Sequence, residues 1–169
     1  MRPTPADPEA WNAYLAEGNA TQARKRVSAD VLLRDEEGRV LLVKPTYKPG
    51  WDLPGGMAEA NEAPDDAARR ELREELGLDI TLHGLLVIGW VPPHGPWDDQ
   101  LAFIFNEGFL ATEARNLTLY DGELVEVSFL DTGQAADLLP PRLRRRFQAA
   151  HASLRQTGPT FLRDGALAF

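Results

Sequence analysis

One short segment constrains this chain more than any other: RRELREELG, residues 69–77, places three glutamates within one turn of a predicted helix. Pro64 suits the first turn of that helix, and Gly77 suits the position just after its last turn. At about 100° per residue, the glutamates share one face. They are Glu71, Glu74 and Glu75. Like charges at this spacing destabilise an isolated helix by roughly 0.2–0.5 kcal/mol per pair, so the face is either fully solvated or opposed by a positive charge.

Length and composition narrow the classes of protein to which the chain can belong. Its 169 residues, 43% of them apolar, suit a single domain with one buried core. With 26 acidic and 18 basic residues the net charge is -8, the wrong sign for tracking a phosphate backbone, so we expect no nucleic-acid polymer as partner. The absence of cysteine excludes disulfides and thiolate zinc sites and favours a reducing compartment. Because no segment resembles a signal peptide or a membrane span, we expect a cytoplasmic protein without a membrane partner.

The order of predicted elements favours an α+β fold over a regular alternation of strands and helices. Two runs rich in Val and Leu, within residues 26–44, flank a polar turn at Gly38 and predict a hairpin. A second helix is expected to begin after Pro141. Further strands are predicted over 51–53, 80–90, 101–110 and 123–131.

The predicted acidic face suits a hard divalent cation. Ala67 and Ala68 precede it on the same side and leave room above the carboxylates, while Leu72 and Leu76 on one flank can anchor the helix to a core. Mg²⁺ and Mn²⁺ prefer oxygen ligands, and Mg²⁺ is commonly held by a few carboxylates together with waters and substrate phosphates. The sequence therefore predicts a Mg²⁺ or Mn²⁺ site on this helix.

The segment from Gly56 to Leu78 resembles the signature of the Nudix hydrolases. That signature is Gly, five residues, Glu, seven residues, Arg-Glu, an aliphatic residue, any residue, Glu-Glu, any residue, Gly and an aliphatic residue. Here it reads GMAEANEAPDDAARRELREELGL, with every signature position occupied. An arbitrary cluster of glutamates is more often simply solvated, but the complete spacing reverses those odds. The resemblance implies an α/β/α sandwich with a mixed central sheet.

The resemblance also implies roles for the three glutamates. Glu71, Glu74 and Glu75 would ligate Mg²⁺ or Mn²⁺, and Glu75 or Glu74 would orient or deprotonate the attacking water. All three are therefore candidate catalytic residues as well as candidate metal ligands.

Other signature positions would build the scaffold. Arg70 and Glu62 would form an ion pair that holds the preceding loop to the helix. Gly55 and Gly56 permit a tight loop, and the backbone carbonyl of Gly55 is a candidate additional metal ligand. Gly77 ends the helix.

Members of this family often add an acidic ligand from outside the signature. Glu123 is the first candidate, because it begins the late predicted strand beside a glycine turn. Glu126 is the second candidate, and Asp98 or Asp99 in a proline-rich loop is the third. The sequence alone does not choose among them.

Four residues are candidates for binding substrate. Arg26, Lys44 and Lys48 come from strands and a loop near the glycines and could reach phosphate groups. Trp97 could stack on a base, although aromatic residues in loops more often pack against their own chain.

Three regions follow from these assignments. Residues 1–25 are predicted to form a helical extension that packs on the core, with Asp7 capping a helix that carries Trp11. Residues 26–157 would form the Nudix hydrolase domain, and residues 158–169 a C-terminal tail.

The predicted activity is Mg²⁺-dependent hydrolysis of a pyrophosphate linkage. The substrate would be a nucleoside diphosphate linked to another moiety, or a nucleoside triphosphate. The alternative is a module that binds nucleotides or nucleotide sugars without cleaving them, but such modules typically lose signature carboxylates, and all are present here. An isomerase on the same scaffold is a third hypothesis, and it would usually need cysteine. A homodimer is also possible, because many relatives are dimers.

Overall fold

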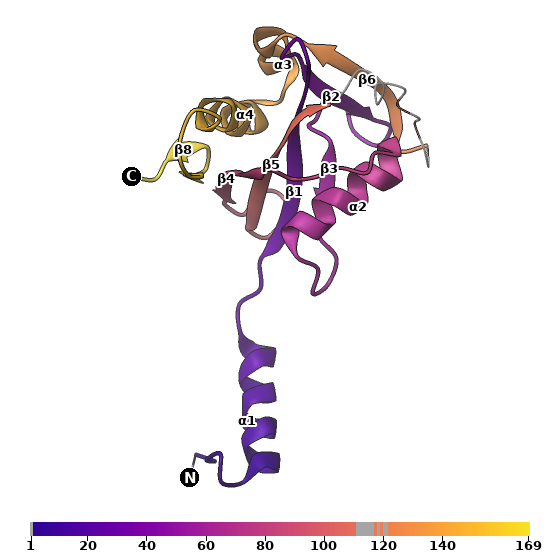
Figure 1. Cartoon of the computed structure of the whole chain (residues 1–169). Coiled ribbons are helices and arrows are strands. Elements are labelled where there is room, and N and C mark those ends of the chain that lie inside the picture. The colour runs from indigo at the N-terminus through magenta and orange to yellow at the C-terminus, as the bar shows by residue number, and fades with distance from the viewer. Residues whose placement is uncertain (1, 111–116, 118, 120–121) are drawn as a thin grey trace.

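The chain folds into an α/β/α sandwich around one mixed β-sheet (Figure 1). The computed structural model describes residues 2–110, 117, 119 and 122–169. Within these residues there are eight strands and four helices, which confirms the predicted α+β class. No helix in the described ranges is long and apolar enough to cross a bilayer.

The elements follow one another in a mixed order, with strands in runs and helices between the runs. Their bounds are α1 Pro8–Thr21, β1 Arg26–Asp35, β2 Val40–Pro45, β3 Gly55–Met57, α2 Pro64–Leu76, β4 Gly84–Val91, β5 Gln100–Leu110, β6 Leu124–Leu130, α3 Thr132–Leu138, α4 Pro141–Ser153, β7 Thr160–Arg163 and β8 Ala166–Leu167.

The sheet has the strand order β6-β2-β1-β5-β4-β7-β8, and β3 pairs with β1. The predicted hairpin of β1 and β2 is present, with Gly38 in the left-handed conformation at its turn. The described pairing between these strands is confined to Arg34 and Val40, while the other edge of β2 pairs with β6 and the other edge of β1 pairs with β5. Where β1 separates from β2, it pairs with β3, so that Gly55 and Gly56 lie beside the middle of β1. After β3, residues 58–63 lead the chain into α2.

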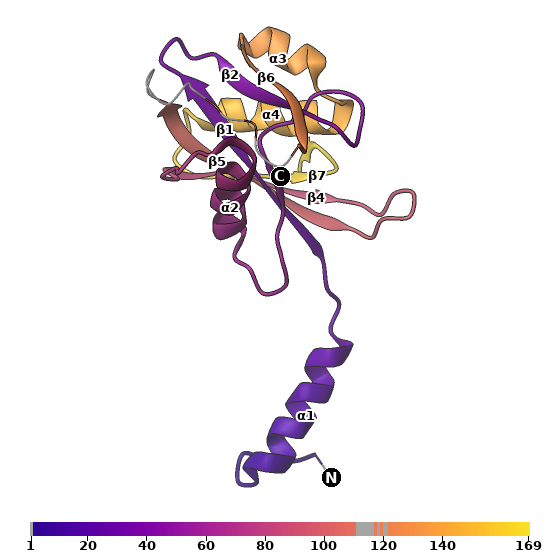
Figure 2. The ribbon, with the colours of Figure 1, turned by 90° about the vertical axis from the view of Figure 1, so that its right-hand side faces the viewer.

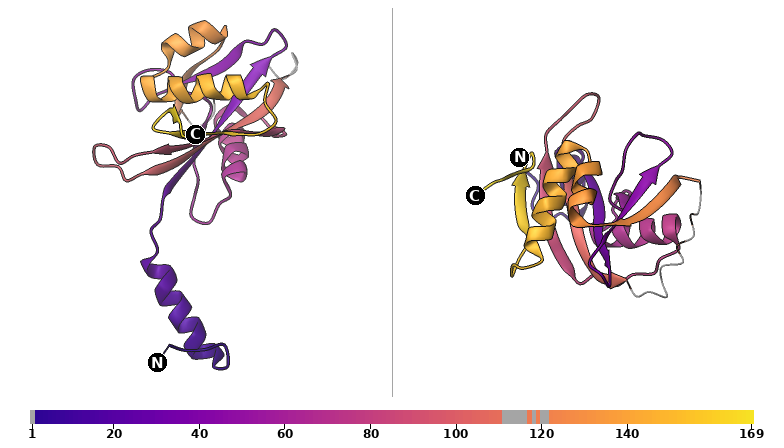
Figure 3. Two further views of the ribbon diagram at one scale, coloured as in Figure 1. Left: turned by 90° about the vertical axis from the view of Figure 1, so that its left-hand side faces the viewer. Right: turned by 90° about the horizontal axis from the view of Figure 1, so that it is seen from above.

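Two apolar layers hold the helices to the sheet, one on each face (Figure 3). On one face α2 buries Leu72 and Leu76, as its predicted apolar flank requires, and also Ala67 and Ala68, which were expected instead to leave room above the acidic face. On the other face α4 packs on the strands, with Phe147 fully buried. Burying a large apolar side chain contributes about 1.5–3 kcal/mol, so both helices are firmly anchored.

The N-terminal helix does not pack on the core, contrary to the prediction. Asp7 caps α1 as expected, accepting a hydrogen bond from the backbone N–H of Ala10 (3.1 Å). However, α1 has no buried residue, and it projects away from the sandwich (Figure 2). Its apolar side is small, and Trp11 stacks on Tyr14 within the helix itself, with ring centroids 5.8 Å apart. Good local capping signals therefore produced a helix without a tertiary contact surface.

The C-terminal segment is not a tail. Residues 160–163 form β7, which pairs in parallel with β4, and β8 pairs with β7 at the edge of the sheet. The prediction was wrong because a four-residue strand after a Gly-Pro turn carries little periodic signal. Two strand bounds also differ: β4 begins only at Gly84, and within residues 51–53 only Asp52 forms a β-bridge, with Val43. The short helix α3 was not predicted.

Candidate active site

Helix α2 presents the three glutamates of the acidic face. Pro64 lies at its first turn, and Gly77 adopts the left-handed conformation just past its end, with φ of 67°. The N–H of Gly77 donates to the carbonyl of Arg73, and that of Leu78 to the carbonyl of Leu72, each at 3.1 Å. These bonds satisfy the last carbonyls of the helix and fix the turn that carries Glu74 and Glu75.

The two glycines of β3 allow the helix to approach the sheet closely. Gly55 has φ of 138°, and a Cβ there would overlap the backbone of Ala29 in β1. A Cβ on Gly56 would overlap the carboxylate of Glu71. Glycine is needed at both positions because backbone and carboxylate occupy the space of a side chain.

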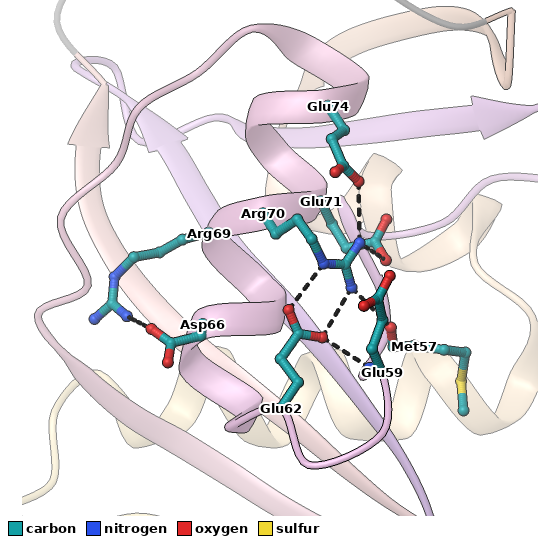
Figure 4. Close-up of polar contacts among 8 residues, drawn as sticks. All are labelled: Met57, Glu59, Glu62, Asp66, Arg69, Arg70, Glu71 and Glu74. Atoms are coloured by element: carbon teal, nitrogen blue, oxygen red, sulfur yellow. Dashed lines mark hydrogen bonds and ion pairs between the residues drawn. The ribbon is translucent and has the colours of Figure 1, made fainter.

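Arg70 connects the loop before α2 to the acidic face (Figure 4). Its Nε and one terminal nitrogen donate to the two carboxylate oxygens of Glu62 at 2.8 and 3.0 Å, and the same terminal nitrogen donates to the carbonyl of Met57 at 3.1 Å. The other terminal nitrogen contacts Glu71 and Glu74, each at 3.0 Å. The paired guanidinium lowers the pKa of Glu62 to about 2, and its carboxylate partners raise the pKa of Arg70.

Glu75 is the most unusual residue of the site. Its side chain is only 6% exposed, and its buried Oε2 has no hydrogen-bond partner within the described part of the chain. Burial, followed by the negative charges of Glu71 and Glu123, raises its pKa to about 8. A buried carboxylate without a partner is unfavourable unless a cation or a proton compensates it.

Glu71 and Glu74 differ from Glu75 in their surroundings. Burial also raises the pKa of Glu71, although the adjacent guanidinium of Arg70 opposes the rise. The side chain of Glu74 is 51% exposed. The acidic face thus combines a buried carboxylate, that of Glu75, with a solvated one, that of Glu74.

The carboxylates fit a divalent cation chemically. In the residues that the structure describes, no three acidic or histidine side chains are already gathered closely enough to enclose an ion. Three observations nevertheless suit one: the unpartnered Oε2 of Glu75, the burial and neighbouring negative charges that raise the pKa values of Glu71 and Glu75, and a donor set made only of oxygen. A bound cation would remove the unfavourable charge that these side chains now share.

The candidate ligands outside the helix lie in different places. Glu123, in the turn before β6, is close enough for its charge to raise the pKa values of Glu71 and Glu75. Glu126 instead pairs with Lys44 at 3.4 Å. Asp99 pairs with Lys25 at 2.6 Å and accepts a hydrogen bond from the indole of Trp90. The geometry therefore favours Glu123 over the other candidates.

A polar cavity of about 250 Å³ is lined by Gly55 and Gly56, and Gly56 lies against the carboxylate of Glu71. Strand β1 supplies Arg26, Ser28 and Asp30 to its wall, β3 supplies Gly55 and Gly56, and α4 supplies Arg146. Lys48, Asp52 and Gln100 complete most of the remaining lining. A cavity lined by three cationic residues, two aspartates and neutral polar groups suits the polar part of a nucleotide.

Of the four candidate substrate residues, the structure places two at this cavity and two outside it. Arg26 and Lys48 line the cavity, where Lys48 is paired with Asp52. Lys44 lies over the ring of Trp51 and pairs with Glu126, outside this cavity. Trp97 is 55% exposed in the β4–β5 connection, and the guanidinium of Arg26 lies 4.5 Å from its ring centroid. Trp97 thus contacts a cavity residue without lining the cavity itself.

Sequence reasoning missed Asp30 and Arg146. Asp30 is 8% exposed in β1, and its carboxylate accepts no hydrogen bond from any described residue. Burial and the charge of Asp52 raise its pKa to about 7. A lone acidic residue in the buried run SADVLL was a usable signal, because aspartate is almost never fully buried without a partner. Nothing in the sequence singled out Arg146 from the other arginines of α4.

Comparison with known proteins identifies the family. The NUDIX domain model matches residues 24–151, most of the chain and all of the site. The chain belongs to the Nudix hydrolase family. This assignment confirms the resemblance carried by Gly56 to Leu78.

Curated relatives of this Nudix protein match it over part of their length. An 8-oxo-dGTP diphosphatase of Proteus vulgaris is 53% identical over 66 residues, which are 39% of this chain and 54% of the relative. An RNA pyrophosphohydrolase of Halorhodospira halophila is 42% identical over 53 residues, 31% of this chain and 29% of the relative. The chain thus matches between about a third and about half of the length of these two relatives.

Solved structures share the fold at low sequence identity. The MutT protein of Methanosarcina mazei Go1 has a TM-score of 0.66 at 23% identity, over 80% of this chain and 100% of that one. The NUDIX domain of Shewanella oneidensis NrtR, solved with ADP ribose, has a TM-score of 0.67 at 17% identity, over 85% and 97%. These likenesses extend the shared architecture beyond the signature segment.

Proposed function

We propose that this Nudix protein hydrolyses a pyrophosphate linkage with the help of Mg²⁺ or Mn²⁺. Its substrate would be a nucleoside triphosphate or a nucleoside diphosphate linked to another moiety. The observation that carries the proposal is Glu75, a carboxylate that is 6% exposed and unpartnered in the described structure, beside Glu71 and a polar cavity. The relatives named for pyrophosphate chemistry support it.

The metal would be held by the carboxylates of the acidic face. Glu71, Glu74 and Glu75 would be its ligands, with Glu123 and the carbonyl of Gly55 as further candidates. When bound, the cation lowers the pKa of water and neutralises charge on the phosphoryl oxygens. The fit rests on the unpartnered oxygen of Glu75 and on an all-oxygen donor set.

The residues of the chain position the reactants and move a proton. Arg70 holds the carboxylates of Glu71 and Glu74 in place through its bonds to both. Glu75 or Glu74 orients the attacking water and accepts its proton as the water oxygen bonds to phosphorus. The bridging P–O bond breaks, and the leaving fragment departs as a phosphate with the electron pair of that bond. Arg26 and Lys48 in the adjoining cavity would bind the phosphate chain.

A substrate panel with two metals tests the proposal. Purified protein is assayed with Mg²⁺ and with Mn²⁺ on nucleoside triphosphates including 8-oxo-dGTP, ADP-ribose, nucleotide sugars, dinucleoside polyphosphates and 5′-triphosphorylated RNA. We expect metal-dependent release of a phosphorylated product from at least one class, and loss of that release in Glu75→Gln. Binding of nucleotides without turnover by the wild type, measured by calorimetry, would favour the binding module instead. Unchanged turnover in Glu75→Gln would refute the assigned role.

A further inference from the structure

Arg146 carries a positive charge that is left unpartnered in the described structure. Its Nε is buried without a hydrogen-bond partner, and neither terminal nitrogen is ion-paired to a described residue. The Nε of Arg144 on α4 is also buried without a partner, but a terminal nitrogen of Arg144 donates to the carbonyl of Asp137, and Arg142 pairs with Asp164 at 3.3 Å. The negative charge of Asp30 lies close to Arg146, but no hydrogen bond or ion pair joins the two side chains in the described residues, so the guanidinium of Arg146 keeps donors for a further anion.

Gly89 makes the path of Arg146 possible. A Cβ at Gly89 of β4 would lie 3.1 Å from Cδ and 3.8 Å from Cγ of Arg146. Because Gly89 has no side chain, the aliphatic part of the Arg146 side chain can pass between the sheet and α4. A glycine inside a strand weakens it and often marks such a close approach. The sheet thus accommodates the arginine at some expense of its own stability.

The guanidinium end of Arg146 borders two neighbouring cavities. One is the cavity of about 250 Å³ beside Gly55 and Gly56, and the other, of about 300 Å³, lies between Trp51 and the start of α4. Both are lined by Lys48, Asp52, Gln100 and Arg146. The two cavities are therefore adjacent to each other at these four residues.

The second cavity is basic and has an aromatic wall. Lys48, Arg142 and Arg146 line it, with Asp52 as the one acidic residue in the lining and Trp51 and His94 as the aromatic ones. Lys48 is neutralised by Asp52, and Arg142 by Asp164, so Arg146 is the cation with capacity for a ligand. Arginine binds phosphate through two parallel N–H donors, whereas a neutral sugar would gain little from this charge.

We propose that Arg146 binds a phosphate group of the substrate beyond the two that the cleaved linkage joins. This inference rests on the proposed function and deepens it, since it favours substrates with a further phosphate beyond the cleaved linkage. Nucleoside triphosphates and dinucleoside polyphosphates carry such a group, whereas nucleoside diphosphate sugars do not. Arg146 is therefore a residue that determines specificity.

The kinetics of Arg146→Met on two substrates with the same base, a nucleoside triphosphate and a nucleoside diphosphate sugar, test this specificity. Methionine keeps an apolar stem beside Gly89 and removes the charge. For a nucleoside triphosphate we expect KM to rise about tenfold to 100-fold, the usual range for a lost charge-assisted hydrogen bond, with kcat changed less than about threefold. For the nucleoside diphosphate sugar of the same base, KM should change less than about threefold. Arg146→Lys should restore part of the affinity for the triphosphate.

A control variant and a second position separate binding from structure. Arg155→Met removes one exposed charge just after α4 and should leave both KM values unchanged. Gly89→Ala should raise KM for the triphosphate in the wild type, because its Cβ displaces the arginine stem, but not in Arg146→Ala. If Gly89→Ala changes the KM for the triphosphate equally in both backgrounds, Gly89 does not act by making room for Arg146.

Equilibrium binding tests the inference without turnover. With Mg²⁺, calorimetry measures the Kd of an α,β-methylene nucleoside triphosphate, which is not cleaved at that position. We expect the Kd of Arg146→Met to exceed that of the wild type by about tenfold or more. Should the wild type bind this analogue through Arg146 yet hydrolyse nothing in the panel, the proposed activity fails while the assigned phosphate contact stands. An unchanged Kd in Arg146→Met would overturn the contact.

Discussion

Replacing Glu75 with Gln should stabilise the metal-free protein at alkaline pH. Glu75 has a pKa of about 8 in the folded protein, against an ordinary value of 4.5. Between these two pH values the unfolded chain has lost the proton that the folded chain still holds, so raising the pH favours unfolding. At about 1.4 kcal/mol for each tenfold change in acidity, the loss is about 5 kcal/mol at most, and relaxation around Glu75 should reduce it to about 2–4 kcal/mol.

Comparing the wild type with Glu75→Gln separates the contribution of Glu75 to the free energy of unfolding from the contributions of other titrating groups. Glutamine has the same shape and stays neutral, so the difference in free energy of unfolding should be near zero at pH 4. It should grow to about 2–4 kcal/mol in favour of the variant at pH 9. Urea unfolding in a chelator across this range measures it. Glu74→Gln, at a side chain that is 51% exposed on the same helix, is the matched control and should show no such growth.

Adding Mg²⁺ should reverse the order of stability. A cation bound by the carboxylates stabilises only the folded state, so the Tm of the wild type should rise with Mg²⁺ concentration. The Tm of Glu75→Gln should rise far less, since an amide carries no charge. A variant that is no more stable than the wild type at pH 9 without metal would refute the claim that Glu75 is a buried carboxylate held against repulsion.

Three further predictions concern the parts around the acidic face. Gly56→Ala should keep the fold, seen by circular dichroism, but reduce metal-dependent turnover at least about tenfold, because the new Cβ displaces the Glu71 carboxylate; full activity would refute the steric argument. Glu62→Gln should lower the Tm at pH 7, where the ionised carboxylate binds Arg70, and far less at pH 2, where the wild-type carboxyl, with a pKa of about 2, is about half protonated; an equal loss at both pH values would exclude the ion pair as the cause. Deleting residues 2–21 should leave the Tm of the sandwich within about 2 °C, since α1 buries no residue, and a large fall in scanning calorimetry would show that the helix does contact the core.

Local features of the sequence were sufficient for several elements of the fold. Asp7, Pro64 and Gly77 predicted helix ends correctly, because capping depends on hydrogen bonds and backbone angles within a few residues. The acidic face of α2 followed from helical periodicity alone. The spacing from Gly56 to Leu78 was enough to indicate the family, since it links a glycine turn to a helix within one continuous segment.

The tertiary structure decided everything that depends on distant segments. Capping signals predicted α1 correctly, but only packing could show that its apolar side has no core to cover. The segment 160–163 became a strand because β4 offered a free edge, and such pairing is invisible in a four-residue stretch. Likewise Arg146 reaches the cavity because Gly89, 57 positions earlier, leaves space beneath α4. Sequence periodicity records the face that a residue occupies, whereas burial, charge pairing and cavities arise only when separate elements are brought together.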